Sequence, residues 1–186
     1  ANVYIALLYN FSRIMTVWRD FLHAQWSIVV IACFYSCQLQ AQETDTIILK
    51  TTEVELYGVL TDAGKGSPIV LMIAGSGATD HNGNGPRLQS NKFLQLADSL
   101  AQYGISSLRY DKRAIGKSKW LEMKEEDIRI DSFVLDATAW VDWIHKKNHF
   151  GEIIIAGHSQ GSLVGMLACL DRPKLVSKFI SISGAG

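Results

Sequence analysis

Short runs of apolar and β-branched residues alternate along this chain with segments of helical periodicity, and this alternation constrains the fold more than any other feature. The run at 69–74 (IVLMIA) is apolar throughout, which is typical of a strand covered on both faces. Only three residues separate the first two runs, too few for a helical crossover, so these are expected to pair antiparallel. The predicted strands are residues 46–51, 55–60, 69–74, 105–110, 152–156 and 179–182.

Helical periodicity fills the segments between these strands. Apolar residues between 93 and 100 follow an i, i+3, i+4, i+7 spacing, with Ser90 or Asn91 as the N-cap. A second helical face is predicted over 133–144, and a mostly apolar helix over 163–170. Strands that alternate with helices imply an α/β fold, with a mostly parallel sheet and helices on both faces.

The segment Gly157-His158-Ser159-Gln160-Gly161 matches G-x-S-x-G and lies between a predicted strand and a predicted helix. In that context it predicts a nucleophile elbow, with Ser159 at a sharp turn in a strained backbone conformation. Side chains at 157 and 161 would collide where strand and helix approach, which explains the two glycines. The N–H of Gln160 would face the reacting carbonyl, and His158 would line the site. The alternative is a glycine-rich turn that happens to contain a serine.

A second glycine-rich loop, AGSGATD at 74–80, follows the strand at 69–74. Glycines in such a loop let the backbone approach a substrate oxygen. With Ser159 as nucleophile, the backbone N–H of Ser76 is predicted to be the second oxyanion donor, and Gly77 is the nearest alternative. The competing interpretation is an ordinary turn between a strand and a helix.

Residues 69–170 resemble the α/β-hydrolase superfamily, in its branch of exported bacterial serine esterases and lysophospholipase-like hydrolases. The resemblance rests on the segments IAGSGATDHNGN, SLRYDKRAIGKS and IIIAGHSQGSLVGMLA. It implies an α/β-hydrolase fold and hydrolysis of a small-molecule carboxylic ester by a Ser-His-Asp triad, without cofactor or metal. Ala114 departs from the pattern, because relatives usually carry glycine there. The segment 109–113 (RYDKR) is expected either to order the rim of the active site or to be a solvated charged turn.

The triad is incomplete in this sequence, because no histidine follows Ser159. In this fold the acid and the histidine follow the serine, so both are expected beyond residue 186 and the fold is predicted to be truncated after its sixth strand. Residues 1–186 alone are then expected to be inactive. A serine peptidase or thioesterase would use the same parts. An alternative of another class is a non-catalytic pseudo-hydrolase or binding remnant.

The segment 26–35 (WSIVVIACFY) is almost wholly apolar, follows Arg19, and precedes small and polar residues. This order is typical of a secretory signal peptide cleaved near Ala41 or Gln42. Ten residues span about 15 Å as a helix, half of a hydrocarbon core of about 30 Å. The alternatives are a short buried helix and lipoprotein anchoring at Cys37.

The chain is therefore expected to divide into 1–42, upstream sequence plus signal peptide, and 43–186, the N-terminal part of one α/β-hydrolase domain. We expect a secreted or periplasmic protein without a stable membrane span once the signal is removed. Lys and Arg (18) balance Asp and Glu (18), so no cation excess is available to bind nucleic acid. Residues 80–85 begin like a calcium loop, but its twelfth position is Asn91 instead of Glu, so no metal is expected.

Overall fold

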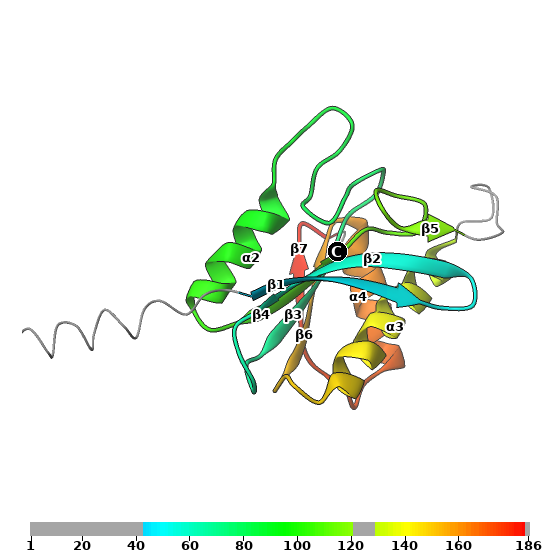
Figure 1. Ribbon diagram of the computed structural model, residues 1–186. Helices are drawn as coiled ribbons and strands as arrows, with labels where there is room; N and C mark the ends of the chain where they lie inside the picture. The colour runs from blue at the N-terminus through cyan, green and yellow to red at the C-terminus, as the bar shows by residue number, and fades with distance from the viewer. Residues whose placement is uncertain (1–42, 121–128, 185–186) are drawn as a thin grey trace, which may run out of the picture. The chain divides into compact units, whose positions relative to one another are not determined.

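The computed structural model describes residues 43–120 and 129–184 (Figure 1). The predicted signal peptide lies outside these residues. The strands are β1 (Glu43–Lys50), β2 (Val54–Asp62), β3 (Ile69–Ile73), β4 (Ser106–Tyr110), β5 (Lys119–Trp120), β6 (Ile153–His158) and β7 (Val176–Ile182). The helices are α2 (Lys92–Gln102), α3 (Ile130–Lys147) and α4 (Gln160–Asp171).

The strands form one mixed sheet in the order β1-β2-β4-β3-β6-β7. The β1–β2 and β2–β4 pairs are antiparallel, whereas β4, β3, β6 and β7 run parallel. The six predicted strands and the antiparallel start are therefore confirmed. The two-residue strand β5 was not predicted; it pairs with β2 off this path, within the charged connection after β4. Two residues are too few to show the alternation that marks a strand.

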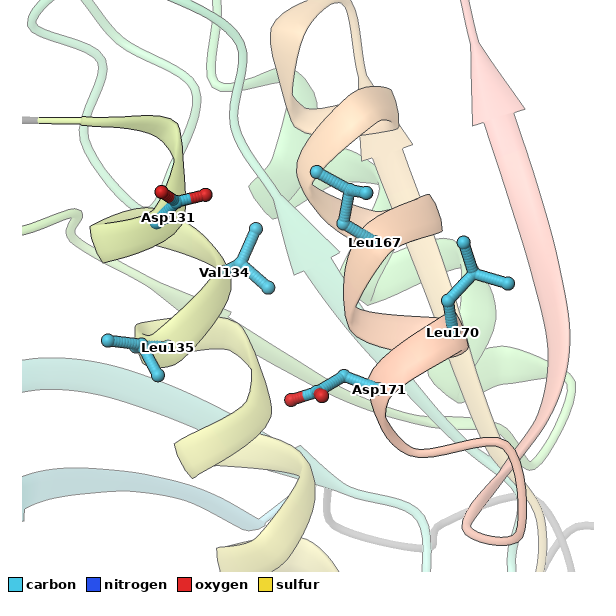
Figure 2. A pocket seen from close by; sticks show the side chains of 6 residues that line it. All are labelled: Asp131, Val134, Leu135, Leu167, Leu170 and Asp171. Atoms are coloured by element: carbon cyan, nitrogen blue, oxygen red, sulfur yellow. The ribbon is translucent and has the colours of Figure 1, made fainter.

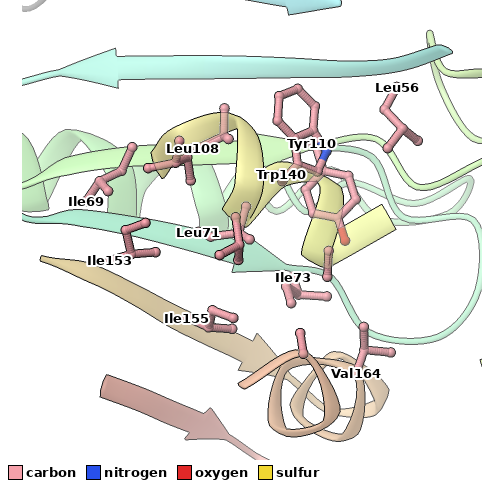
Figure 3. Close-up of a cluster of buried hydrophobic side chains, with 14 of the residues drawn as sticks. Leu56, Ile69, Leu71, Ile73, Leu108, Tyr110, Trp140, Ile153, Ile155 and Val164 are labelled. Atoms are coloured by element: carbon pink, nitrogen blue, oxygen red, sulfur yellow. The ribbon is translucent and has the colours of Figure 1, made fainter. Parts of the chain in front are cut away.

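Helices cover both faces of the sheet, with α3 and α4 on one face and α2 on the other (Figure 1). Successive residues of β3 alternate between the two cores: Leu71 packs on the α3/α4 side and Met72 on the α2 side. This double burial explains the uninterrupted apolar run at 69–74. Figure 3 shows the larger core, which contains the fully buried Trp140 of α3. The centres of the Trp140 and Tyr110 rings are 5.8 Å apart.

The helix boundaries follow the predicted periodicity, but the capping differs. Asn91 is the N-cap of α2, yet its side chain makes no capping hydrogen bond and instead accepts one from Asn84 Nδ2 at 2.8 Å. Ser90 donates its hydroxyl to the carbonyl oxygen of Gly83. Both predicted caps therefore brace the preceding loop. No helix in 43–120 or 129–184 is long and apolar enough to cross a membrane.

The strand order ends at β7, which pairs with β6. Two large apolar side chains of β7, Phe179 and Ile180, are 37% and 47% exposed. Within the described residues no other strand pairs with β7, and this edge of the sheet is open to solvent.

Candidate active site

Ser159 lies at a sharp turn between β6 and α4, with φ 53° and ψ −122°. A serine rarely adopts positive φ, so this conformation stores strain that the surrounding structure must hold. The backbone N–H of Ser159 donates to the carbonyl oxygen of Ile182 at 2.9 Å, which ties the turn to β7. The hydroxyl of Ser162 donates to the Gly157 carbonyl oxygen at 2.7 Å and so links the two ends of the turn. The turn has the geometry predicted for a nucleophile elbow.

The two flanking glycines are required by the packing of this turn. A β-carbon on Gly157 would collide with the carbonyl oxygen of Gly161. A β-carbon on Gly161 would collide with the carbonyl oxygen of Ile73 and lie 2.7 Å from that of Ala74. The strand-to-helix approach therefore has the crowding that the G-x-S-x-G spacing predicts.

The loop after β3 lies directly beside the elbow. A β-carbon on Gly75 would lie 3.1 Å from the β-carbon of Ser159 and 3.1 Å from the carbonyl oxygen of His158. The backbone N–H groups of Ser76, Gly77 and Gln160 donate to no acceptor within 43–120 and 129–184. The three predicted oxyanion donors are thus free to bind a substrate oxygen.

The segment 109–113 is not a solvated turn. Asp111, Lys112 and Arg113 are 1%, 5% and 2% exposed, so of the two interpretations the ordering of the site's rim is the one that fits. Sequence reasoning did not predict that these charges are buried, nor which partners they have. The only feature of the sequence that suggested a role for these three residues is their position immediately after a buried strand.

Asp111 joins two loops at the carboxyl end of the sheet. Its Oδ1 accepts the backbone N–H of His81 at 2.7 Å and lies 2.8 Å from the ring Nδ1, while Oδ2 accepts the N–H of Lys117 at 2.8 Å. Burial opposes ionisation of Asp111, but hydrogen bonds from His81 and Lys117 outweigh it and hold its pKa below the usual value. The contact between His81 and Asp111 therefore fixes the loop that carries Ser76 to the end of β4.

Arg113 ties the rim to α3 by a buried, two-pronged ion pair. Its Nε and Nη2 donate to the two carboxylate oxygens of Asp136 at 2.9 and 2.7 Å, and Nη2 also donates to the carbonyl oxygen of Ser132. Burial lowers the pKa of Arg113, but the hydrogen bond and charge of Asp136 outweigh it and raise that pKa. The start of α3 is thereby fixed to the end of β4.

Lys112 points from the same segment into the loop after β3. Its Nζ donates to the carbonyl oxygens of Gly75 at 2.6 Å and Gly77 at 2.9 Å. The ammonium also lies 5.5 Å from the centre of the Phe133 ring. Burial lowers the pKa of Lys112. The loop that carries the predicted oxyanion donors is thus held by a cation from the next strand end.

His158, the last residue of β6, lies beside the loop after β3, since its Nδ1 would be 3.1 Å from a β-carbon on Gly75. Its ring packs edge-on to Phe93, and its Nδ1 is buried with no hydrogen-bond partner within the described residues. Burial, and then the charge of Lys92, lower the pKa of His158. Within the same residues no hydrogen bond joins the Ser159 hydroxyl to a histidine or a carboxylate. The acid and base of the triad stay predictions.

Asp80, the first residue of the calcium-like segment, is turned toward its own loop. Its Oδ1 accepts the backbone N–H groups of Asn82 at 2.9 Å and Asn84 at 2.8 Å. The part of the chain that the structure describes contains no group of three or more His, Cys, Asp or Glu side chains placed to hold a metal ion. The Asp80 carboxylate therefore organises the loop.

A separate hollow of about 420 Å³ lies between α3 and α4 (Figure 2). None of the predicted site residues lines it. Its walls are Asp131, Val134, Leu135, Leu167, Leu170 and Asp171.

Comparisons with known proteins agree with this architecture. Residues 84–186 match the Hydrolase_4 family, described as serine aminopeptidase, S33. The chain is 28% identical over 118 residues to monoglyceride lipase of Mus musculus, which covers 63% of this chain and 36% of that protein. It is 26% identical over 116 residues to the monoglyceride lipase homolog of monkeypox virus, covering 62% and 38% of the two chains. The chain thus spans little more than a third of the curated relatives it matches.

Solved structures show the same fold. Est1E from Butyrivibrio proteoclasticus, with ferulic acid bound, superposes with a TM-score of 0.63 at 25% identity, covering 74% of this chain and 52% of that one. The α/β-hydrolase domain-containing protein 10 from mouse superposes with a TM-score of 0.61 at 20% identity, covering 76% and 50%. Because the family match spans more than half of the chain and the fold agrees, this chain belongs to the Hydrolase_4 (serine aminopeptidase, S33) family of the α/β-hydrolase superfamily.

Proposed function

We propose that this protein hydrolyses carboxylic esters through an acyl-enzyme formed at Ser159. The observation that carries the proposal is the strained elbow at Ser159, where the segments of Gln160 and Ser76 meet and where neither N–H group has an acceptor among the described residues. A strained serine at a helix N-terminus beside free backbone donors is the arrangement that acyl transfer needs.

In the proposed mechanism the Ser159 oxygen attacks the ester carbonyl as its proton passes to a histidine base. The carbonyl oxygen becomes an oxyanion that accepts hydrogen bonds from the N–H groups of Gln160 and Ser76. Collapse of this intermediate expels the alcohol, which takes the proton from the histidine, and leaves the acyl group on Ser159. Water then attacks the acyl-enzyme by the same steps and releases the acid.

Monoglyceride lipases among the relatives favour an ester as substrate. The family description, serine aminopeptidase, makes cleavage of a peptide bond the second candidate. Both reactions use the same nucleophile and oxyanion donors, so they differ in the leaving group and in the residues that bind it. Ester hydrolysis is the better supported of the two, because the relatives from mouse and monkeypox virus are named as a monoglyceride lipase and a homolog of one.

The test uses the protein produced from its complete reading frame. We expect it to hydrolyse p-nitrophenyl butyrate, and Ser159→Ala to lower kcat by roughly 1000-fold or more. Ser99→Ala is the matched control, since Ser99 is an exposed serine of α2 whose hydroxyl donates to the carbonyl oxygen of Gln95 in its own helix. An aminoacyl p-nitroanilide assayed alongside decides between ester and peptide. Equal turnover by wild type and Ser159→Ala contradicts the proposal, and no turnover of either substrate by wild type favours a non-catalytic binding protein.

A further inference from the structure

The ammonium of Lys112 is buried, yet its hydrogen bonds go to main-chain carbonyls. Its Nζ binds the carbonyl oxygens of Gly75 and Gly77, and within 43–120 and 129–184 it forms no ion pair with a carboxylate. Taking a cation out of water without a counter-ion destabilises a fold. The carbonyl oxygens of Gly75 and Gly77 offset part of this penalty, so the ammonium and the loop after β3 hold each other in place.

The position of these carbonyls determines where the intervening N–H groups point. No cis peptide bond occurs among the described residues, and in a trans peptide the C=O and N–H groups point in opposite directions. The Gly75 carbonyl and the Ser76 N–H belong to one peptide group. A hydrogen bond that draws the Gly75 oxygen toward Lys112 therefore turns the Ser76 N–H away from Lys112.

A second anchor fixes the curvature of the loop. The Gly77 carbonyl oxygen accepts from Lys112 at 2.9 Å and from the Thr79 N–H at 2.9 Å. Gly77 itself has φ +79°, a conformation that glycine adopts without strain. Ser76 therefore lies between two carbonyls that bind the same ammonium.

The loop meets the nucleophile through Gly75. The β-carbon position of Gly75 is 3.1 Å from the Ser159 β-carbon, so a rotation of the Gly75–Ser76 peptide would change the donor that faces the reacting carbonyl. A cation bonded to the carbonyl also polarises that peptide group, which makes its N–H a stronger donor.

We propose that Lys112 is a positioning residue for the oxyanion site: its ammonium holds the Gly75 and Gly77 carbonyls so that the Ser76 N–H is presented to the oxyanion formed at Ser159. This inference rests on the proposed acyl transfer. The distance between donor and oxyanion matters most in the transition state, so loss of Lys112 acts on kcat more than on KM.

The test compares Lys112→Met with Lys117→Met in the complete protein. Lys117 is the matched control, because it is an exposed lysine of the same connection between β4 and β5, and its Nζ contacts Tyr57 and not the loop after β3. We expect Lys112→Met to lower kcat roughly 10- to 100-fold while KM stays within about 3-fold. Lys117→Met should match wild type.

A trifluoromethyl ketone provides the readout that a loss of packing would not move. This inhibitor forms a hemiketal oxyanion with the nucleophilic serine, whereas the corresponding amide binds without forming one. We expect Lys112→Met to weaken binding of the ketone by the same factor by which it lowers kcat/KM. Binding of the amide should not change. Should Lys112→Met not fold, Lys112→Gln, which keeps two donors without charge, is expected to show a smaller loss of the same kind.

The outcomes separate the two proposals. If the wild-type protein has no Ser159-dependent turnover, the proposed function fails before any lysine variant is compared. If wild type is active and a folded Lys112 variant retains the wild-type kcat, only the role of Lys112 is overturned. The same holds if the variant loses affinity for the ketone and for the amide by equal factors.

Discussion

Gly161, in the first turn of α4, lies against the carbonyl oxygen of Ile73 at the end of β3, where a β-carbon could not fit. The loop that carries Ser76 begins directly after β3, so the same close contact brings the elbow beside that loop. Gly75, in that loop, is likewise close to the elbow, because a β-carbon on it would lie 3.1 Å from the β-carbon of Ser159. Two glycines therefore set the spacing between the nucleophile and its predicted oxyanion donors.

Gly161→Ala is expected to disturb this contact. A methyl group forced against main chain should destabilise the protein by about 1–3 kcal/mol, as overpacking does, and lower ester turnover by moving Ser159. Urea unfolding measures the first effect. Gly85→Ala is the control, because its β-carbon would lie 3.8 Å from the nearest atom, Ala78 O. Equal unfolding midpoints for the two variants would show that the close contact does not matter.

Asp111→Asn is expected to lose stability in a pH-dependent way. The folded-state pKa of Asp111 is lowered, so its contribution is complete above the unfolded-state pKa of about 4 and disappears as the pH falls through the folded-state value. We expect a loss of about 2 kcal/mol at pH 7 that shrinks below about pH 4. Unfolding free energies of wild type and variant across that range measure it. Asp45→Asn, an exposed carboxylate of β1, is the control; a difference that is constant with pH contradicts the prediction.

The buried pair of Arg113 and Asp136 is expected to be costly to break from one side. Asp136→Asn removes the buried carboxylate charge that accepts from Nε and Nη2 of Arg113 and should cost about 3–5 kcal/mol. The exposed pair of Arg172 and Asp142 provides the comparison, and Asp142→Asn should cost less than about 1 kcal/mol. Thermal unfolding of both variants tests this. Similar losses of stability in Asp136→Asn and Asp142→Asn would contradict the prediction that the buried ion pair matters more than the exposed one.

Export of the protein by the predicted signal peptide can be tested with a fusion protein. Residues 15–50, fused to a phosphatase that is active only outside the cytoplasm, should give activity in a bacterial host, and cleavage should occur near Ala41 or Gln42. Replacing two apolar residues of 26–35, Val29 and Ile31, by Asp should abolish it. Activity that survives this change, or a fusion that keeps its N-terminus and stays inside, contradicts the predicted signal peptide.

Local patterns predicted what depends on neighbours in sequence. The apolar run at 69–74 predicted a doubly covered strand, and the flanking glycines predicted the sharp turn at Ser159. The burial of Lys112 could not be predicted in this way, because its partners lie 37 and 35 residues away and a charged triplet usually faces water. Nor could β5, whose pairing with β2 depends on the path of the connecting segment.

The central proposal, an acyl-enzyme at Ser159, is tested most directly by covalent labelling. The protein from the complete reading frame is treated with a fluorophosphonate, and the adduct is located by mass spectrometry of its peptides. We predict one adduct per chain, on the peptide that contains Ser159, and none in Ser159→Ala or in heat-denatured protein. An active protein that gives no adduct, or an adduct on another residue that persists in Ser159→Ala, would contradict Ser159 as the nucleophile.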